Sequence, residues 1–346
     1  MPDAGDHVLC FGRNANGELG SGSGAPILSS AAPLKSVGAG LFHSFAISQS
    51  GDLYTWGAGS GGQLGQPRGE GNTTFGESSK AHVGAPTRVR CGQTSVVHAA
   101  AGRNHSLAIT VDGLLYSWGR ASEGQLGHGH STGAGATRRV ADTDLQNPRL
   151  VPKPEDLPQF RTAACGEHFS AAVSPGGIVH TWGCTHNGQL GHAARSHAEV
   201  APIPRSVFGG ELVTRIALGW RHALCVTQAG KLYSWGCGTA GQLGRGARKD
   251  SPQPAIVQSL AKEQVTNVAA GRAHSLAVTN SGLSFAFGDN EHGQCGVGIA
   301  PPAASQGGAA NSDTPTTGSA EGDSSEAGGE PVGASYVGAF ALRPQP

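Results

Sequence analysis

Short alternating runs of apolar and polar residues dominate this chain. Residues 105–110 and 114–118 are examples, because both are rich in β-branched or aromatic side chains and Asp112-Gly113 lies between them. Two such runs around an Asp-Gly dipeptide predict a β-hairpin. The arrangement recurs around Gly51, Gly177, Gly230 and Gly282, and no long stretch has the 3.6-residue period of a helix. The pattern therefore predicts an all-β protein.

Three short motifs accompany these hairpins at fixed spacing. Six aromatic-Gly pairs occur at intervals of 45 to 64 residues, beginning at Phe11, Trp56, Trp118, Trp182, Trp235 and Phe287. Each pair precedes a Gly-Gln-Leu-Gly string or a variant of it, beginning at Gly17, Gly62, Gly124, Gly188, Gly241 and Gly293. A Gly-x-x-His sequence stands upstream of every aromatic except the first, with Phe169 replacing the histidine in its third copy.

These motifs define a repeat of about 50 residues that holds about four predicted strands, the size of one propeller blade. We count six blades, which form either a six-bladed ring or an incomplete seven-bladed one. We expect residues 1–298 to be the β-propeller. Residues 299–346 form a low-complexity tail rich in Gly, Ala and Ser. An apolar segment near 335–342 is our candidate for the strand that closes the ring by pairing with residues 9–20.

The joint occurrence of the three motifs resembles the regulator of chromosome condensation family, whose members fold as β-propellers. The resemblance covers about residues 6 to 298. It implies protein recognition, and in one member of the family the propeller loosens the nucleotide of a small GTPase by inserting loops against it. Gly219-Trp220-Arg221-His222 is in addition similar to a motif of a plant UV-B photoreceptor in the same family. That receptor needs several Trp-Arg pairs at a dimer face.

Composition narrows the class of partner. Lys and Arg total 24, as do Asp and Glu, so there is no strong electrostatic signal for nucleic acid or an anionic membrane. The amino terminus lacks the charged and apolar regions of a signal peptide, and we expect a monomer in the cytoplasm or nucleus. The seven cysteines include no Cys-x-x-Cys pair. Cys184 and Cys237 both follow Trp-Gly, so they occupy equivalent turns of adjacent blades. Reduced structural thiols are the favoured interpretation of the cysteines, with a redox pair or zinc site as the alternative.

Residues repeated in every blade are expected to be structural. His43, His105, His222 and His274 occupy one repeat position, where we expect each to hydrogen bond with backbone or a neighbouring blade. The Trp residues are expected to form blade core, with each indole N–H reaching a partner. They are Trp56, Trp118, Trp182 and Trp235.

Residues that vary at a fixed repeat position are the candidates for recognition. The two residues between Gly and His are expected to begin the strand nearest the propeller axis and to emerge around one rim. Arg and aromatic residues there are typical of binding hot spots. The predicted partner-binding residues are Phe42, Arg103, Asn104, Glu167, His168, Trp220, Arg221 and Arg272. Two insertions, residues 66–85 and 128–147, are expected to extend from one face beside them.

The sequence thus predicts a protein-interaction propeller, with guanine-nucleotide exchange on a small GTPase as its most concrete possible activity. The alternatives are a scaffold or adaptor, such as a ubiquitin-ligase-associated propeller, and a UV-B sensor. No nucleophile with a base, no carboxylate pair and no metal-ligand spacing stands out, so we assign no catalytic residue, metal ligand or cofactor.

Overall fold

The computed structural model describes residues 14–20, 33–66, 82–129, 145–152, 159–192 and 198–296. Within these residues the chain forms five antiparallel sheets, four of them four-stranded and one three-stranded, which we number as blades in chain order. Blade 1 consists of β1 (Leu34–Ala39), β2 (His43–Ser48), β3 (Leu53–Ala58) and β4 (His82–Val89). Blade 2 consists of β5 (Val96–Ala101), β6 (His105–Thr110), β7 (Leu115–Gly119) and β8 (Leu145–Leu150).

The remaining three blades repeat the same order. Blade 3 consists of β9 (Thr162–Cys165), β10 (Phe169–Val173), β11 (Val179–Gly183) and β12 (Ala201–Ile203). Blade 4 consists of β13 (Val213–Leu218), β14 (His222–Thr227), β15 (Leu232–Gly236) and β16 (Ser251–Ile256), and blade 5 of β17 (Val265–Ala270), β18 (His274–Thr279) and β19 (Ser284–Gly288). Two short 3-10 helices, η2 (Arg205–Phe208) and η3 (Gln258–Leu260), connect blades 3 to 4 and 4 to 5.

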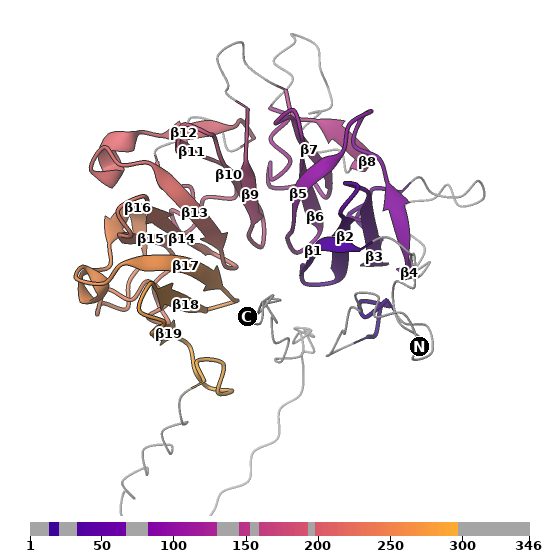
Figure 1. The fold of residues 1–346 in the computed structure, drawn as a ribbon. Helices are drawn as coiled ribbons and strands as arrows, with labels where there is room; N and C mark the ends of the chain where they lie inside the picture. The colour runs from indigo at the N-terminus through magenta and orange to yellow at the C-terminus, as the bar shows by residue number, and fades with distance from the viewer. Residues whose placement is uncertain are drawn as a thin grey trace, which may run out of the picture.

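The blades follow one another around a common centre, with the first strand of each blade inside and the last outside (Figure 1). This arrangement confirms the predicted all-β propeller. Among the described residues, no helix is long and apolar enough to cross a membrane. The predicted tail and its closing strand near 335–342 lie outside the described residues, as does most of both insertions.

In each of the five blades, the aromatic-Gly pair lies at or next to the end of the third strand, where backbone segments come close together. Gly57 has a φ of 108°, and a Cβ there would lie 2.6 Å from the main-chain oxygen of Phe42. Only glycine combines that conformation with so close an approach. The glycine therefore allows the end of the third strand to contact the backbone of the turn that precedes the second strand.

The Gly-Gln-Leu-Gly turn of one blade is bonded to the next blade. The main-chain oxygen of Gln63 accepts hydrogen bonds of 2.8 Å from both the Trp118 indole and the Ser106 hydroxyl of blade 2. The main-chain oxygen of Glu18 accepts the same pair of bonds from Trp56 and Ser44 of blade 1. Residues 14–20 thus sit against blade 1 as the turns of blades 1 to 4 sit against the following blade.

The repeat histidines also connect blades. His43 Nε2 lies 2.7 Å from Ser106 Oγ, and the corresponding distances are 3.0 Å for His105 and Ser170 and 2.9 Å for His222 and Ser275. Because each of these serines donates its own proton to a main-chain oxygen, the imidazole Nε2 must donate to the serine. Burial lowers the pKa of His43 to about 4 and those of His105 and His222 to about 3.

Candidate functional site

The variable residue pairs form the turn between the first and second strands of each blade, and we call them the rim turns. Their residues are 41–42, 103–104, 167–168, 220–221 and 272–273. We had expected them to begin the strand nearest the axis, and that expectation was wrong. The innermost strand is the preceding run, such as Val96–Ala101, whose alanines fit the crowded centre. The rim turns lie where that strand leaves the centre.

Neighbouring rim turns touch one another. Leu41 N donates a 3.1 Å hydrogen bond to the Gly102 oxygen of the next blade, and Glu167 N donates one of 3.1 Å to the Trp220 oxygen. At Gly102, an added Cβ would lie 2.7 Å from the oxygen of Gly166. The glycine that begins each Gly-x-x-His motif therefore lets neighbouring rim turns pack together.

A charged cluster crosses three of these turns. Glu167 Oε1 accepts a 2.7 Å bond from Arg103 Nη1 of blade 2, and Glu167 Oε2 accepts a 3.1 Å bond from Arg221 Nε of blade 4. The Glu167 side chain is only 4% exposed, whereas that of Arg221 is 57% exposed. We had placed Glu167 among residues that contact a partner. Its burial between two guanidinium groups makes it the residue that holds the arginines in place.

His168 and Trp220 complete this part of the surface. His168 Nε2 lies 3.8 Å from Glu167 Oε1. Burial lowers the pKa of this half-buried histidine, and the nearby Glu167 carboxylate, which raises it, only partly offsets that effect. The guanidinium carbon of Arg272 lies 4.1 Å from the centre of the Trp220 ring, a cation-π contact between blades 4 and 5. Phe42 and Asn104 are half-buried in the first two rim turns.

A second row of residues lies beside the rim turns, and the sequence reasoning missed it. In each of the five blades, the residue after the aromatic-Gly pair donates its main-chain N–H to the main-chain oxygen of the second residue of the rim turn. Arg120 N bonds the Asn104 oxygen at 2.8 Å, and Cys184 N bonds the His168 oxygen at 2.9 Å. The fixed spacing from the aromatic-Gly pair could have revealed this row. Its segments are residues 58–61, 120–123, 184–187, 237–240 and 289–292.

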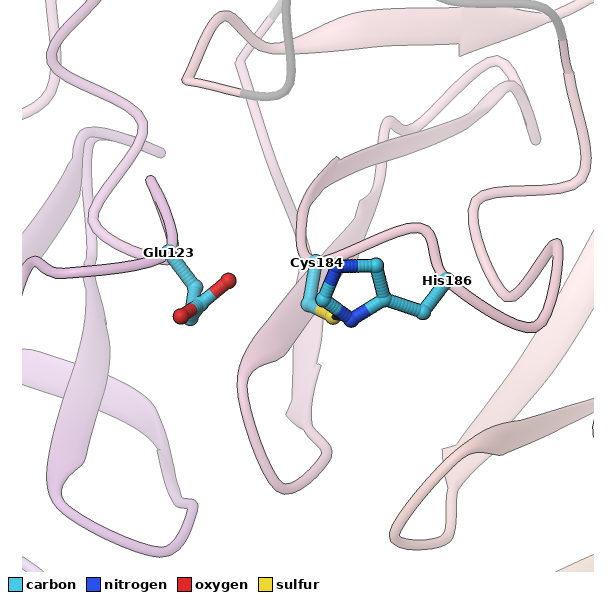
Figure 2. A group of neighbouring side chains, drawn as sticks. All are labelled: Glu123, Cys184 and His186. Carbon is cyan, nitrogen blue, oxygen red and sulfur yellow. Dashed lines mark hydrogen bonds between the residues drawn. The ribbon is translucent and has the colours of Figure 1, made fainter.

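Three of its side chains form a compact cluster between blades 2 and 3. Cys184 Sγ lies 3.3 Å from His186 Nδ1, and a carboxylate oxygen of Glu123 lies within 4.8 Å of both atoms. Figure 2 shows Glu123 extending from one loop toward the Cys184 and His186 pair on the neighbouring loop. Burial raises the pKa of the Cys184 thiol. The sequence favoured a structural thiol at Cys184, with a redox pair or zinc site as the alternative, and did not single out Glu123 or His186.

Comparisons with known proteins agree with this architecture. The model of the regulator of chromosome condensation (RCC1) repeat matches residues 50–109, 112–173, 176–226 and 229–278. The chain is 32% identical to the ultraviolet-B receptor UVR8 of Arabidopsis thaliana, over 85% of this chain and 64% of the receptor. It is 31% identical to the human E3 ubiquitin-protein ligase HERC2, over 71% of this chain and 5% of the ligase. The chain thus spans less than two thirds of each of these relatives.

Solved structures are similar over most of the chain. Human WBSCR16 is 25% identical, with a TM-score of 0.64 over 78% of this chain and 66% of that one. Yeast RCC1 (Prp20), in a complex with Kap60, is 22% identical, with a TM-score of 0.65 over 83% and 67%. The repeat matches, the relatives and the propeller architecture lead to one conclusion: this chain belongs to the regulator of chromosome condensation (RCC1) repeat family.

Proposed function

We propose that this propeller is a protein-interaction module and that the rim turns, with the second row beside them, form its binding face. The observation that carries the proposal is the Arg103–Glu167–Arg221 cluster, which connects three successive blades through one buried carboxylate. Arginines fixed in this way lose little side-chain entropy when a partner binds. A preorganised surface of this kind favours specific recognition.

The chemistry of the face suits a protein partner. Arg120 and Arg272 are exposed, Arg221 is more than half exposed, and Trp220 lies partly open beside them. Arg and Trp are the residue types that contribute most to binding energy at protein interfaces. The chain as a whole carries no formal net charge, so it lacks the overall positive charge typical of proteins that bind a long polyanion. Its local basic and aromatic surface instead suits an acidic protein surface.

A small GTPase is the most specific candidate partner, and nucleotide exchange is the activity that this would imply. Support comes from the family, and the structure of yeast Prp20p was described together with its binding to Gsp1p and histones. That structure is 21% identical to this chain, so it shows the fold alone. An adaptor role is the alternative, supported by the similarity to HERC2 and to human HERC3, which is 34% identical over 60% of this chain.

The interaction proposal is tested with a rim variant and a matched control. Arg120→Glu combined with Arg272→Glu reverses two exposed rim charges without touching Glu167. Lys262→Glu reverses one charge at an exposed residue before β17, at the end of that strand opposite to the rim turn. In native pull-downs with mass spectrometry, we expect wild type and K262E to capture the same proteins and the rim variant to lose them. Retention by the rim variant would refute the proposed face.

The exchange activity is tested separately. The purified protein is added to a panel of small GTPases loaded with a fluorescent nucleotide, and release is followed over time. We expect faster release from one GTPase with the wild type and K262E, and no acceleration with the rim variant. A panel without acceleration would rule out exchange on its members and favour the adaptor function.

A further inference from the structure

Glu123, Cys184 and His186 lie in the second row of the proposed binding face, and the proposed function does not depend on the metal-ligating chemistry of their side chains. Glu123 comes from the turn after β7, directly before its Gly-Gln-Leu-Gly string, whereas Cys184 follows β11 immediately. The three donors therefore meet at the junction of two blades. A group bound by all of them would connect the loops of blades 2 and 3.

The spacing of the donor atoms suits a small tetrahedral ion. Zinc binds thiolate at about 2.3 Å and imidazole nitrogen at about 2.0 Å, so in a tetrahedral site these atoms lie roughly 3.5 Å apart. Cys184 Sγ and His186 Nδ1 are 3.3 Å apart, and all three donors lie within 4.8 Å of one another. A change in the side-chain torsions of Glu123 would bring its carboxylate oxygen to the spacing of a tetrahedral site.

The ligand types select the metal. Thiolate and imidazole favour zinc, whereas magnesium and calcium prefer sites made of oxygen. The surrounding charges are mixed, because Arg120 and Arg221 lie in the same region. Arg221 is bonded to Glu167, which offsets its charge. The Glu123 carboxylate and the Cys184 thiolate would neutralise both charges of a divalent ion.

The next blade provides a natural negative control. At the corresponding positions, Asn187, Cys237 and Thr239 replace Glu123, Cys184 and His186. Cys237 Sγ lies 3.4 Å from Thr239 Oγ1. The cysteine is therefore kept in blade 4 with a polar side chain beside it, but the imidazole and the carboxylate are absent. The repeat alone therefore does not require the full ligand set.

We propose that Glu123, Cys184 and His186 bind one zinc ion between blades 2 and 3, with the fourth position open to water. Binding transfers the Cys184 thiol proton to solvent, and His186 Nδ1 turns its lone pair from the thiol to the metal. The site lies in the second row of the binding face. Its occupancy is independent of whether that face binds a partner.

The test uses the full chain, reduced and freed of metal with a chelator. Cobalt(II) is titrated in as a spectroscopic substitute for zinc, and zinc then displaces it. We expect one equivalent of cobalt to give a thiolate-to-metal absorption band, which zinc abolishes. Cys184→Ser should remove the band, and His186→Gln should weaken zinc binding by more than about 100-fold, the upper range of effects from outer-sphere partners. Cys237→Ser should leave both unchanged.

Thermal unfolding distinguishes loss of zinc binding from loss of folding in each variant. Without metal, each variant should melt within a few degrees of the wild type. With zinc, the melting temperature should rise for wild type and C237S but not for C184S or H186Q. The proposal is overturned if wild type gives no thiolate band, if C184S keeps it, or if C237S loses zinc binding to the same extent.

Discussion

Phe169 and Ala223 lie in one buried apolar cluster between blades 3 and 4, at positions where a histidine donates to a serine at three other junctions. At this junction both the histidine and the serine of the other junctions are replaced by apolar residues. A serine without the histidine could still donate to the main-chain oxygen of Gln189, but a histidine without the serine would lose its acceptor. The chain thus contains polar and apolar versions of the same interblade contact.

This relationship predicts a strong coupling between the two positions. Phe169→His alone should destabilise the protein by about 2–4 kcal/mol, because Phe169 is fully buried and the imidazole would have no acceptor. Adding Ala223→Ser should recover about 1–3 kcal/mol. Urea unfolding of wild type, both single variants and the double variant measures the coupling. Additive effects would show that the His–Ser bond contributes nothing to the contact.

The buried histidines predict a loss of stability in mild acid. Burial holds the folded pKa of His43 at about 4 and that of His222 at about 3, below the usual value of 6.5. The unfolded chain therefore binds more protons as the pH falls below about 6.5, and stability declines until the folded pKa is reached. Each such histidine should cost about 1 kcal/mol per pH unit in that range. Urea midpoints measured from pH 7.5 to 5 should fall accordingly.

A matched variant isolates the histidine contribution. His222→Phe combined with Ser275→Ala copies the apolar junction of blades 3 and 4 into the junction of blades 4 and 5. This variant should show a shallower dependence of the urea midpoint on pH than wild type. An unchanged slope would assign the acid sensitivity to other groups.

The segment around Glu18 should stabilise blade 1. Its main-chain oxygen accepts bonds from Trp56 and Ser44, and Trp56 is 1% exposed. Deleting residues 1–20 removes this acceptor and uncovers the indole. Two lost bonds at about 1 kcal/mol each should lower the melting temperature by roughly 2–4 °C apiece. Scanning calorimetry checks this, and identical melting curves would show that the segment does not support the blade.

Illumination with UV-B should leave the oligomeric state unchanged. Among the rim turns that the structure describes, Trp220 is the one indole, and it stacks on Arg272 rather than on further Trp residues. The similarity to UVR8 makes this worth testing directly. Size-exclusion profiles before and after illumination should superimpose. A dimer that separates in the light would instead establish a photoreceptor.

The repeat motifs predicted much of the fold because each has one local role that spacing alone reveals. Gly57 allows close contact with Phe42, and Trp118 reaches the turn at Gln63. The positions of the rim turns were predicted less well. An alanine-rich run such as Val96–Ala101 does not show from its pattern that it is the innermost strand.

Contacts between side chains of different blades could not be predicted from the repeats. Glu167 is buried at a point where Arg103 and Arg221 reach it from the blades on either side. Glu123 and Cys184 are likewise brought together by the angle between two blades. Spacing within one repeat gives no measure of that angle, and the residues involved differ from blade to blade.

The proposed binding face is tested most directly by site-specific photo-crosslinking. A photoreactive amino acid is placed at Arg120, beside the Asn104 rim turn, or at Lys262, at the opposite end of blade 5. In cells or lysate, we predict that a discrete partner protein is cross-linked from position 120 and not from position 262. Cross-linking of the same protein from position 262, with none from position 120, would contradict the account.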